Sequence, residues 1–479
     1  MPEATLLWAP SAWLAGGWQQ AVLLEAGGDG SWSGVTAGVH TPPPQAQRLA
    51  GPAIPGLVNA HSHAFQRAFA ALAERHEVDR GHESDDHDGD DFWSWRDRMY
   101  RVAQRIEPEQ MQAIAAQLYI ELLRGGYTHV CEFHYLQHRP DGSLYPDPLV
   151  MSWALAAAGA EAGMPLTLLP ALYERAGFAQ SGPQSGLNAA QQRFRADAQQ
   201  VCAMRAAIAT HHSAGVRAGL AIHSLRAAAP ASIARLRQLA EDFDGPIHIH
   251  VAEQADEVFQ CRAALGAPPI EWLSQQGALD RRWQLVHATH ATAAEIELAA
   301  RSGAGVVLCP STEANLGDGT CDLPAWLDSG APISIGSDSH VTRSWREEVR
   351  WLEYGQRLLK RRRNVGAGRD EPSTAGRLFA RLVEGSAAAA GFPCWGLRPG
   401  ARADLLVVDR SDSSLLGVPV PQVLDALVFS SPGRQWRDVM VAGRWQIWNH
   451  VHTAAARVAE RFERAMGELW GSQARGAST

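Results

Sequence analysis

Residues 54–63 read IPGLVNAHSH, an apolar run of strand length that ends in two histidines separated by one serine. Side chains two residues apart on a β-strand point to the same face, so His61 and His63 can converge on one cation while Ser62 points away. Such a pair also occurs without a metal, with its rings solvated or bonded to the backbone. The rest of the chain must decide between these two interpretations.

Apolar runs of strand length recur through the middle of the chain and alternate with helical segments such as Glu109 to Leu123 and Asn188 to Thr210. Eight units of this size predict an α/β fold, a (β/α)₈ or TIM barrel over residues 56–396, with catalytic groups at the carboxyl ends of its strands. The expected strands are residues 54–60, 127–133, 165–170, 216–223, 246–252, 284–287, 305–309 and 332–336.

The two ends of the chain share a different pattern, in which short apolar runs are broken by Gly-rich turns. Residues 21–24, 403–409 and 438–447 are examples, and the pattern predicts short antiparallel strands. We therefore expect residues 1–55 and 397–450 to form one small flanking β-sandwich domain. A C-terminal helix and tail are expected over residues 451–479.

The chain of 479 residues carries 43 basic and 51 acidic residues, a net charge of −8. This balance argues against nucleic acid as a partner, because binding to phosphates requires a basic face. The chain begins without a secretion signal and contains no apolar run near the about 18 residues that cross a membrane. Its six scattered cysteines are interpreted as buried thiols in a reducing compartment, so a cytoplasmic protein without a membrane partner is expected.

Polar residues stand at the ends of nearly all the expected barrel strands. Left unpaired, each would cost about 1–3 kcal/mol, and a metal offsets that cost for all of them together. Three imidazoles and one carboxylate suit one divalent transition metal, by default Zn²⁺, with a position left open for water. Such a metal lowers the pKa of its water to about 7. The proposed ligands are His61, His63, His250 and Asp338.

The third ligand is a choice between two histidines. In His248-Ile249-His250 both rings share one face of the strand, so alternation does not distinguish them. We prefer His250, which lies nearer the carboxyl end of the strand and three residues before Glu253.

Three residues are candidates for the chemistry itself. Asp338, in IGSDSH, can bind the metal and accept a proton from its water, with a helix N-cap as the alternative role. Glu253 can carry protons to a leaving nitrogen, with a surface carboxylate as the alternative. His287, which ends the run WQLVH, can orient hydroxide and stabilise developing charge.

These residues resemble the motifs of the amidohydrolase superfamily. The matching segments are PGLVNAHSH (55–63), HIH (248–250), LVH (285–287), GSD (336–338) and GARADLLVVD (400–409). The resemblance spans almost the whole chain and implies a metal-dependent hydrolase with a flanking β-domain. Residues 165–170 contain no lysine, so the carbamylated lysine that bridges two metals in some relatives is missing, and one metal per subunit is expected. The glutamate three residues after the third histidine resembles the deaminases of this superfamily.

Four segments narrow the resemblance to the formimidoylglutamate deiminase family of histidine degradation: HSHAFQRA (61–68), FWSWR (92–96), EFHY (132–135) and STEANLGDG (311–319). That family hydrolyses N-formimidoyl-L-glutamate to N-formyl-L-glutamate and ammonia, and barrels of this kind are often homodimers. The resemblance implies attack of zinc-bound hydroxide on the formimidoyl carbon. It also implies that Gln66 lies near the formimidoyl group, and that the amino-acid end is surrounded by Arg96, Tyr135, His223 and Arg226.

The charge of that substrate fits these residues. A small-molecule dicarboxylate needs local cations in a protein of net charge −8, and arginine recognises carboxylates in a planar, bidentate way. An exposed, solubilising arginine is the alternative role for Arg96 and Arg226. The acidic stretch of residues 76–91, interpreted as an exposed loop, departs in length from the family's pattern.

Two other functions remain open on the sequence. A deaminase of a purine or related ring would use the same metal site, but it would need stacking walls and amide donors rather than paired arginines. A catalytically silent barrel that serves as a scaffold would have lost ligands, whereas here all of them are present.

Overall fold

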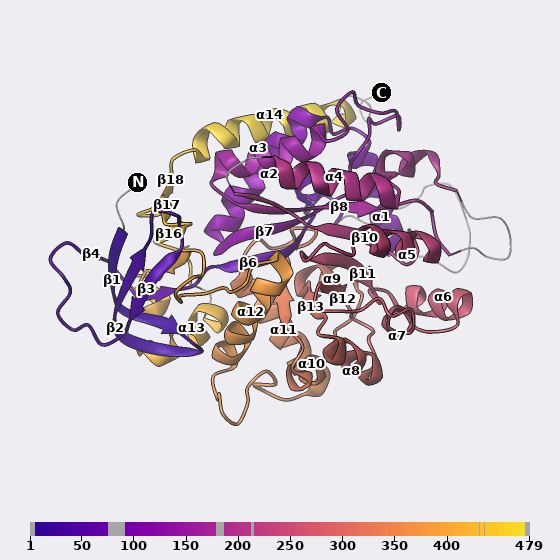
Figure 1. The fold of residues 1–479 in the computed structure, drawn as a ribbon. Coiled ribbons are helices and arrows are strands. Elements are labelled where there is room, and N and C mark those ends of the chain that lie inside the picture. Colours follow the sequence, from indigo (N-terminus) through magenta and orange to yellow (C-terminus); the bar gives the residue numbers. More distant parts are fainter. Residues whose placement is uncertain are drawn as a thin grey trace.

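The computed structural model describes residues 5–74, 92–178, 186–211, 215–430, 432–434 and 436–474. These residues form a parallel barrel covered by helices and a separate sheet built from both chain ends, which confirms the predicted fold class (Figure 1). The acidic stretch of residues 76–91 lies outside the described residues.

Eight parallel strands form the barrel, and their order in the sheet follows the chain. Every residue of these strands except His223 is buried, as expected for a sheet that is filled inside and covered outside. A short additional strand, β9 (Val216–Ala218), pairs with β8. The eight strands are β6 (Leu57–Ser62), β7 (Tyr127–His134), β8 (Leu166–Leu172), β10 (Leu220–Ser224), β11 (Ile247–Val251), β12 (Trp283–His287), β13 (Gly305–Leu308) and β14 (Ile333–Ile335).

The barrel closes between the ends of its first and last strands. Ser62 and Asp338 form a parallel bridge. The Asp338 N–H donates to the His61 carbonyl at 3.0 Å, and the His63 N–H donates to the Asp338 carbonyl at 3.3 Å. A Cβ atom at Gly336 would stand 2.5 Å from Cβ of His61 and 2.8 Å from its backbone N and O. Glycine at this position therefore allows the two strands to approach closely.

Helices surround the barrel and also cover its amino-terminal end. There, Ser386 of α12 (Thr374–Ala390) accepts from the Val58 N–H at 3.4 Å, and the Ala389 carbonyl accepts from Cys131 at 3.3 Å. The other helices are α1 (Phe92–Ala103), α2 (Pro108–Arg124), α3 (Val150–Ala162), α4 (Ala198–Thr210), α5 (Pro230–Leu239), α6 (Ala255–Leu265), α7 (Pro269–Gln275), α8 (Ala293–Ser302), α9 (Pro310–Leu316), α10 (Leu323–Ser329), α11 (Trp345–Lys360), α13 (Val423–Phe429) and α14 (Ala455–Ala474). The helix α14 lies along α2 (Figure 1).

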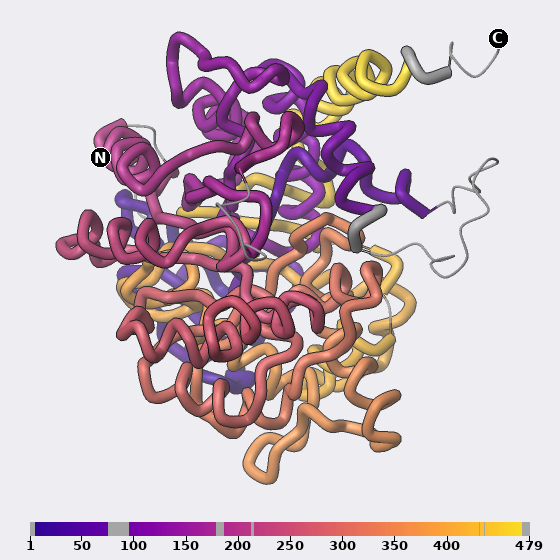
Figure 2. The backbone as a smooth tube through the Cα atoms, turned by 90° about the vertical axis from the view of Figure 1, so that its right-hand side faces the viewer, coloured from indigo at the N-terminus to yellow at the C-terminus, as the bar shows by residue number. Residues whose placement is uncertain are grey.

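The second sheet joins the two ends of the chain. Its strands follow the order β18-β17-β16-β15-β5-β1-β2-β3, with β4 paired to β1. The link is β5, which pairs with β1 on one side and β15 on the other. In the view of Figure 2 this sheet lies behind the barrel. Its strands are β1 (Thr5–Leu14), β2 (Gly17–Ala26), β3 (Trp32–Thr36), β4 (Gln47–Arg48), β5 (Ala53–Ile54), β15 (Leu405–Val407), β16 (Asp438–Val441), β17 (Arg444–Trp448) and β18 (Val451–His452).

The structure corrects several element boundaries. The first predicted strand is split, because Pro55 has no N–H to donate and the chain passes there from β5 in the outer sheet to β6 in the barrel. The predicted strand over residues 216–223 is divided into β9 and β10. The predicted helix over residues 188–210 is divided into a 3₁₀ turn (Ala189–Phe194) and α4, which has its own N-cap at Asp197.

The cysteines are all free, but two of the six, Cys202 and Cys394, are only half-buried, so the prediction of buried thiols is wrong for them. None of the helices in the described part of the chain has the length and apolar character needed to span a membrane.

Alanine at Gly336 should strain the barrel closure, because its methyl group would overlap the backbone of His61. We expect Gly336→Ala to lower the free energy of unfolding by about 1–3 kcal/mol, measured by urea denaturation. Gly467→Ala is the matched control, since a Cβ there meets no atom within 4 Å and alanine favours the helix. Wild-type stability of Gly336→Ala would contradict the tight closure.

Candidate metal centre and substrate pocket

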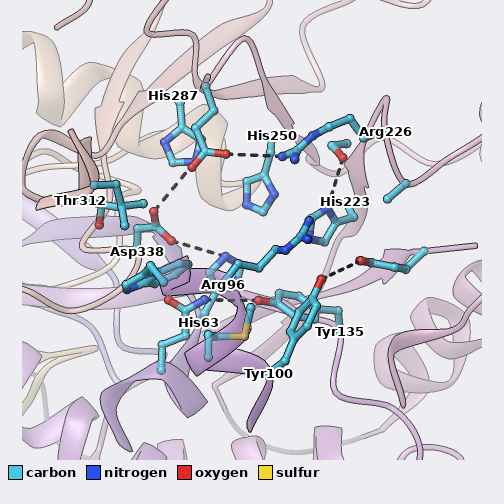
Figure 3. A pocket seen from close by; sticks show the side chains of 18 of the residues that line it. His63, Arg96, Tyr100, Tyr135, His223, Arg226, His250, His287, Thr312 and Asp338 are labelled. Carbon is cyan, nitrogen blue, oxygen red and sulfur yellow. Dashed lines mark hydrogen bonds and ion pairs between the residues drawn. The ribbon is translucent and has the colours of Figure 1, made fainter. Parts of the chain in front are cut away.

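A pocket opens at the carboxyl ends of the barrel strands (Figure 3). The residues predicted to bind substrate or to take part in the chemistry all line it: Gln66, Arg96, Tyr135, His223, Arg226, Glu253, His287 and Asp338. Of the predicted metal ligands, His63, His250 and Asp338 line the pocket, and His61 is fully buried next to them. The structure therefore brings the whole predicted set together.

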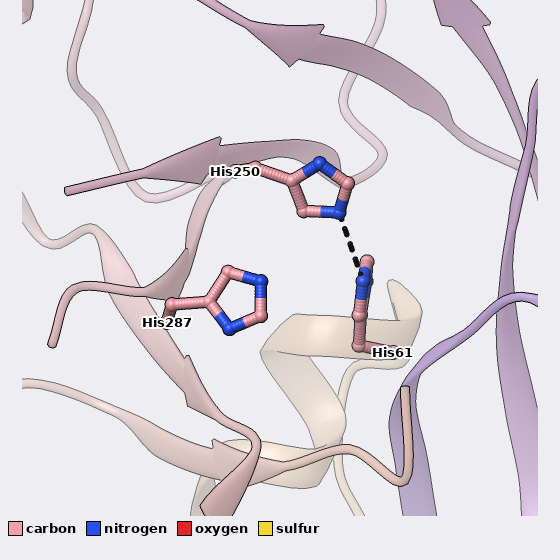
Figure 4. A group of neighbouring side chains, drawn as sticks. All are labelled: His61, His250 and His287. Atoms are coloured by element: carbon pink, nitrogen blue, oxygen red, sulfur yellow. Dashed lines mark hydrogen bonds between the residues drawn. The ribbon is translucent and has the colours of Figure 1, made fainter. Parts of the chain in front are cut away.

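The four predicted ligands converge on one small region. Nε2 of His61 and Nε2 of His250 lie 2.9 Å apart, and Oδ1 of Asp338 lies 3.4 Å from Nε2 of both His61 and His63. Donors that bind one zinc ion at about 2.0–2.2 Å are separated by about 3–3.5 Å, so these spacings fit a single metal. The rings of His61, His250 and His287 face one another across the same region (Figure 4).

The protonation of the rings also fits a metal. Nδ1 of His63 donates to the Phe133 carbonyl at 2.9 Å, which leaves its Nε2 with a free lone pair toward the centre. Burial lowers the pKa of His61 to about 3, and burial also lowers the pKa values of His63 and His250. Three neutral imidazoles and a carboxylate form a donor set for a divalent cation.

The structure distinguishes the two histidines of β11. His250 faces the predicted centre, whereas Nε2 of His248 donates to the Ala389 carbonyl of α12 at 2.9 Å. Both side chains are buried inside the barrel, as alternation predicts, but His248 lies one layer nearer the amino-terminal end. The hydrogen bond to α12 satisfies His248 as a core residue.

Three ionisable residues lie beside the centre. Nε2 of His287 lies 3.6 Å from Oε1 of Glu253 and 3.9 Å from Oδ2 of Asp338. Burial lowers the pKa of His287, but the charge of Glu253 and the neighbouring side chains of Cys309 and Glu313 outweigh burial and raise that pKa well above its usual value. Burial raises the pKa of Glu253. His287 and Glu253 can therefore share a proton at neutral pH.

The backbone of two of these residues is strained. Asp338 and His287 have φ angles of 47° and 70°, in the left-handed region that residues other than glycine rarely adopt. Such conformations cost about 1–3 kcal/mol each and persist where the surrounding structure enforces them, commonly at functional sites.

A buried carboxylate holds the segment that carries the first two ligands. Glu132 of β7 accepts from Ser62 Oγ at 2.7 Å, from the Ala64 N–H at 2.6 Å and from the Tyr119 hydroxyl at 3.2 Å. Burial raises the pKa of Glu132 to about 8. Ser62, which points away from the centre as predicted, is thus part of the support of its two neighbours.

The opposite part of the pocket offers groups for a polar substrate. Nε2 of Gln66 donates to the Tyr135 hydroxyl at 3.3 Å, and its buried Oε1 has no hydrogen-bond partner among the described residues. A guanidinium nitrogen of Arg226 lies 3.9 Å from Oε2 of Glu253. The guanidinium of Arg96 lies 5.5 Å from the centre of the Tyr100 ring.

Several residues of the pocket wall have no role predicted from the sequence, among them Tyr100, Tyr173, Arg175 and Thr312. Tyr100 lies one helical turn after Arg96 on α1, which is a usable signal. Tyr173 and Arg175 follow β8, which extends two residues past its predicted end at residue 170. Thr312 belongs to the segment STEANLGDG. Apart from the family resemblance of that segment, nothing in the sequence indicates a role for Thr312.

Comparisons with known proteins find similar chains and structures. The amidohydrolase family model matches residues 53–446. A formimidoylglutamate deiminase of Pseudomonas aeruginosa is 44% identical over 97% of this chain and 99% of its own. An 8-oxoguanine deaminase of the same species is 28% identical over 82% of each chain. The crystal structure of an amidohydrolase from Brucella melitensis has a TM-score of 0.88 at 38% identity, covering 97% of this chain and 99% of its own.

Separate substitution of the two histidines of β11 should show which one is the metal ligand and which one is a core residue. We expect His250→Ala to weaken zinc binding by at least about 100-fold, because one of the four predicted ligands would be lost. His248→Ala should leave zinc affinity within about threefold and lower only the thermal stability, since its partner is the Ala389 carbonyl. Competition with a chromogenic chelator measures both affinities, and equal losses would contradict the assignment.

Proposed function

The chain belongs to the amidohydrolase family, whose members are hydrolases, and on this premise we propose that it hydrolyses N-formimidoyl-L-glutamate to N-formyl-L-glutamate and ammonia in histidine degradation. The observation that supports the proposal best is that one pocket combines a metal-ligand set with arginines suited to a dicarboxylate. The 44% identity to a relative of that name supports it independently.

The proposed metal is one divalent ion per subunit, for which zinc is our choice. His61, His63, His250 and Asp338 would hold it. When bound, such an ion supplies a nucleophile at neutral pH by lowering the pKa of water to about 7.

The reaction adds water to the carbon of the formimidoyl C=N bond, and the terminal nitrogen then leaves as ammonia while a formyl C=O bond forms. Two protons must move from the water to that nitrogen. Glu253 is placed to carry them, because burial raises its pKa and His287 lies 3.6 Å away. Asp338 and His287 orient the attacking water, and protonated His287 stabilises the negative charge that develops.

The remaining pocket residues fix the substrate. We propose that the free Oε1 of Gln66 accepts from the formimidoyl N–H group. Arg96, Tyr135, His223 and Arg226 bind the amino-acid end, with the arginines paired to carboxylates. The enzyme is proposed to be a cytoplasmic homodimer.

Two other functions receive less support from the pocket. Deamination of a purine-like ring is represented among the relatives by the 8-oxoguanine deaminase, and the tyrosines of the pocket offer stacking surfaces. The several arginines on the same wall, however, favour an acyclic dicarboxylate. A scaffold role is disfavoured because none of the predicted ligands has been lost.

The proposal is tested by ammonia release from zinc-loaded protein. N-formimidoyl-L-glutamate should release one ammonia per molecule, a chelator should abolish the activity, and zinc should restore it. Guanine and 8-oxoguanine are the comparison substrates. Turnover of a ring without turnover of N-formimidoyl-L-glutamate would contradict the proposal, as would a lack of release from every substrate.

Removal of the Arg226 charge should selectively lower the activity on the acyclic substrate. We expect Arg226→Ala to lower kcat/KM for N-formimidoyl-L-glutamate by about 10- to 100-fold, because a charge-assisted hydrogen bond is lost. Arg235→Ala is the control, since Arg235 is exposed on α5 and donates to Gln238. Unchanged kinetics of Arg226→Ala would argue against the dicarboxylate.

A further inference from the structure

A fully buried histidine, His340, lies two residues past the predicted ligand Asp338 and takes no part in the proposed reaction. It follows β14, the last strand of the barrel, and it is not part of the pocket wall. A buried imidazole is costly unless its ring nitrogens find hydrogen-bond partners. The partners of these two nitrogens therefore indicate what the residue does.

One ring nitrogen of His340 bonds to the end of the first barrel strand. Its Nε2 lies 3.1 Å from the carbonyl oxygen of His63, and because a carbonyl only accepts, Nε2 carries the proton and donates. Ser62 Oγ lies farther from Nε2, at 3.5 Å, and donates its own proton to Glu132. The His63 carbonyl also accepts from the Gln66 N–H at 2.9 Å. His340 and the turn that carries Gln66 thus share one acceptor, which belongs to a predicted metal ligand.

A chain of hydrogen bonds between fully buried side chains fixes this tautomer of His340. Oδ1 of Asn59 accepts from the Ser337 N–H at 2.9 Å, so Nδ2 of the same amide donates to Ser337 Oγ, at 2.8 Å. The proton of the Ser337 hydroxyl is left to donate, and its only acceptor in the described part of the chain is Nδ1 of His340, at 3.0 Å. Because Nδ1 accepts, the ring proton resides on Nε2 and points at the His63 carbonyl.

The bond from His340 completes the support of His63. The His63 N–H donates to the Asp338 carbonyl at 3.3 Å, and its ring Nδ1 donates to the Phe133 carbonyl at 2.9 Å. The backbone of His340 closes a turn around Asp338, since its N–H donates to the Ser337 carbonyl at 2.8 Å. The side chain of His340 therefore joins the turn that carries Asp338 to the segment that carries His63.

We propose that His340 is a positioning residue of the metal centre, which holds the His63 carbonyl so that the His63 ring and the Asp338 turn keep the geometry that binds zinc. The inference rests on the metal centre of the proposed function and not on the choice of substrate. Residues that orient metal ligands from outside typically contribute about 10- to 100-fold in metal affinity.

The competing role of His340 is to fill a left-handed turn in the core. Its φ of 64° is a conformation that asparagine tolerates better than longer side chains do. Three substitutions separate the two roles. Glutamine places an amide N–H where Nε2 of histidine lies, methionine has a similar length without a donor, and the amide of asparagine is too short to reach the His63 carbonyl.

The experiment measures the zinc affinity of the metal-free full chain by competition with a chromogenic chelator. His340→Met and His340→Asn should each weaken zinc binding by about 10- to 100-fold, because the donor to the His63 carbonyl is lost. His340→Gln should stay within about threefold of the wild type, because the donor is kept. The asparagine variant serves in place of the methionine variant if the latter does not fold.

His452→Met is the matched control. His452 of the outer sheet is also buried, and its Nε2 donates to the Ala162 carbonyl at 2.9 Å. Loss of this bond should lower the thermal stability but leave the zinc affinity within about threefold of the wild type.

Equal losses of affinity in the glutamine and methionine variants would overturn the positioning role. Wild-type affinity of His340→Met, or an asparagine variant that binds zinc better than His340→Gln, would do the same, and each of these results leaves the proposed function in place. A wild type that binds no zinc would overturn the proposed metal centre, and the role of His340 with it.

Discussion

The backbone pairing that closes the barrel between Asp338 and the His61–His63 segment is the interaction on which the candidate site depends. Two hydrogen bonds, at 3.0 Å and 3.3 Å, join these residues. They bring ligands from the first and last barrel strands together, so the geometry of the centre follows from the geometry of the closure. Gly336 permits this approach, because any larger residue would meet His61. The same pairing holds Asp338 in its left-handed conformation.

Burial explains how the remaining polar groups divide between structure and function. Inside a barrel filled with apolar side chains, a polar group without a partner is expensive. His248 bonds to Ala389, Nδ1 of His63 bonds to Phe133, and Ser62 bonds to Glu132. These groups are satisfied by the protein itself. Oε1 of Gln66, which has no such partner among the described residues, lies in the pocket, where a polar substrate would satisfy it.

The sequence predicts the barrel and the centre well because both are determined by local rules. Strand periodicity and strand-end position were enough to place His61, His63, His287 and Asp338 at one end of the barrel. The choice of His250 over His248 needed the position along the strand, and the structure shows that α12 satisfies the residue nearer the amino-terminal end.

Other features depend on tertiary contacts that no local pattern encodes. The break at Pro55 is visible in the sequence, but the transfer of Ala53 and Ile54 to another sheet requires the carboxyl-terminal strand β15 to be in place. Glu132 stands out as a strand-end carboxylate, yet its three hydrogen-bond donors come from two separate segments, the end of β6 with the turn after it and helix α2. Arg175 reaches the pocket only because its loop is bonded to the loop after β10.

The metal site itself is tested most directly by anomalous X-ray diffraction at the zinc edge from crystals of the zinc-loaded protein. One peak per chain, about 2.0–2.2 Å from Nε2 of His61, His63 and His250 and from a carboxylate oxygen of Asp338, is the predicted result. Two peaks in the pocket, or a peak bound by other residues, would contradict it.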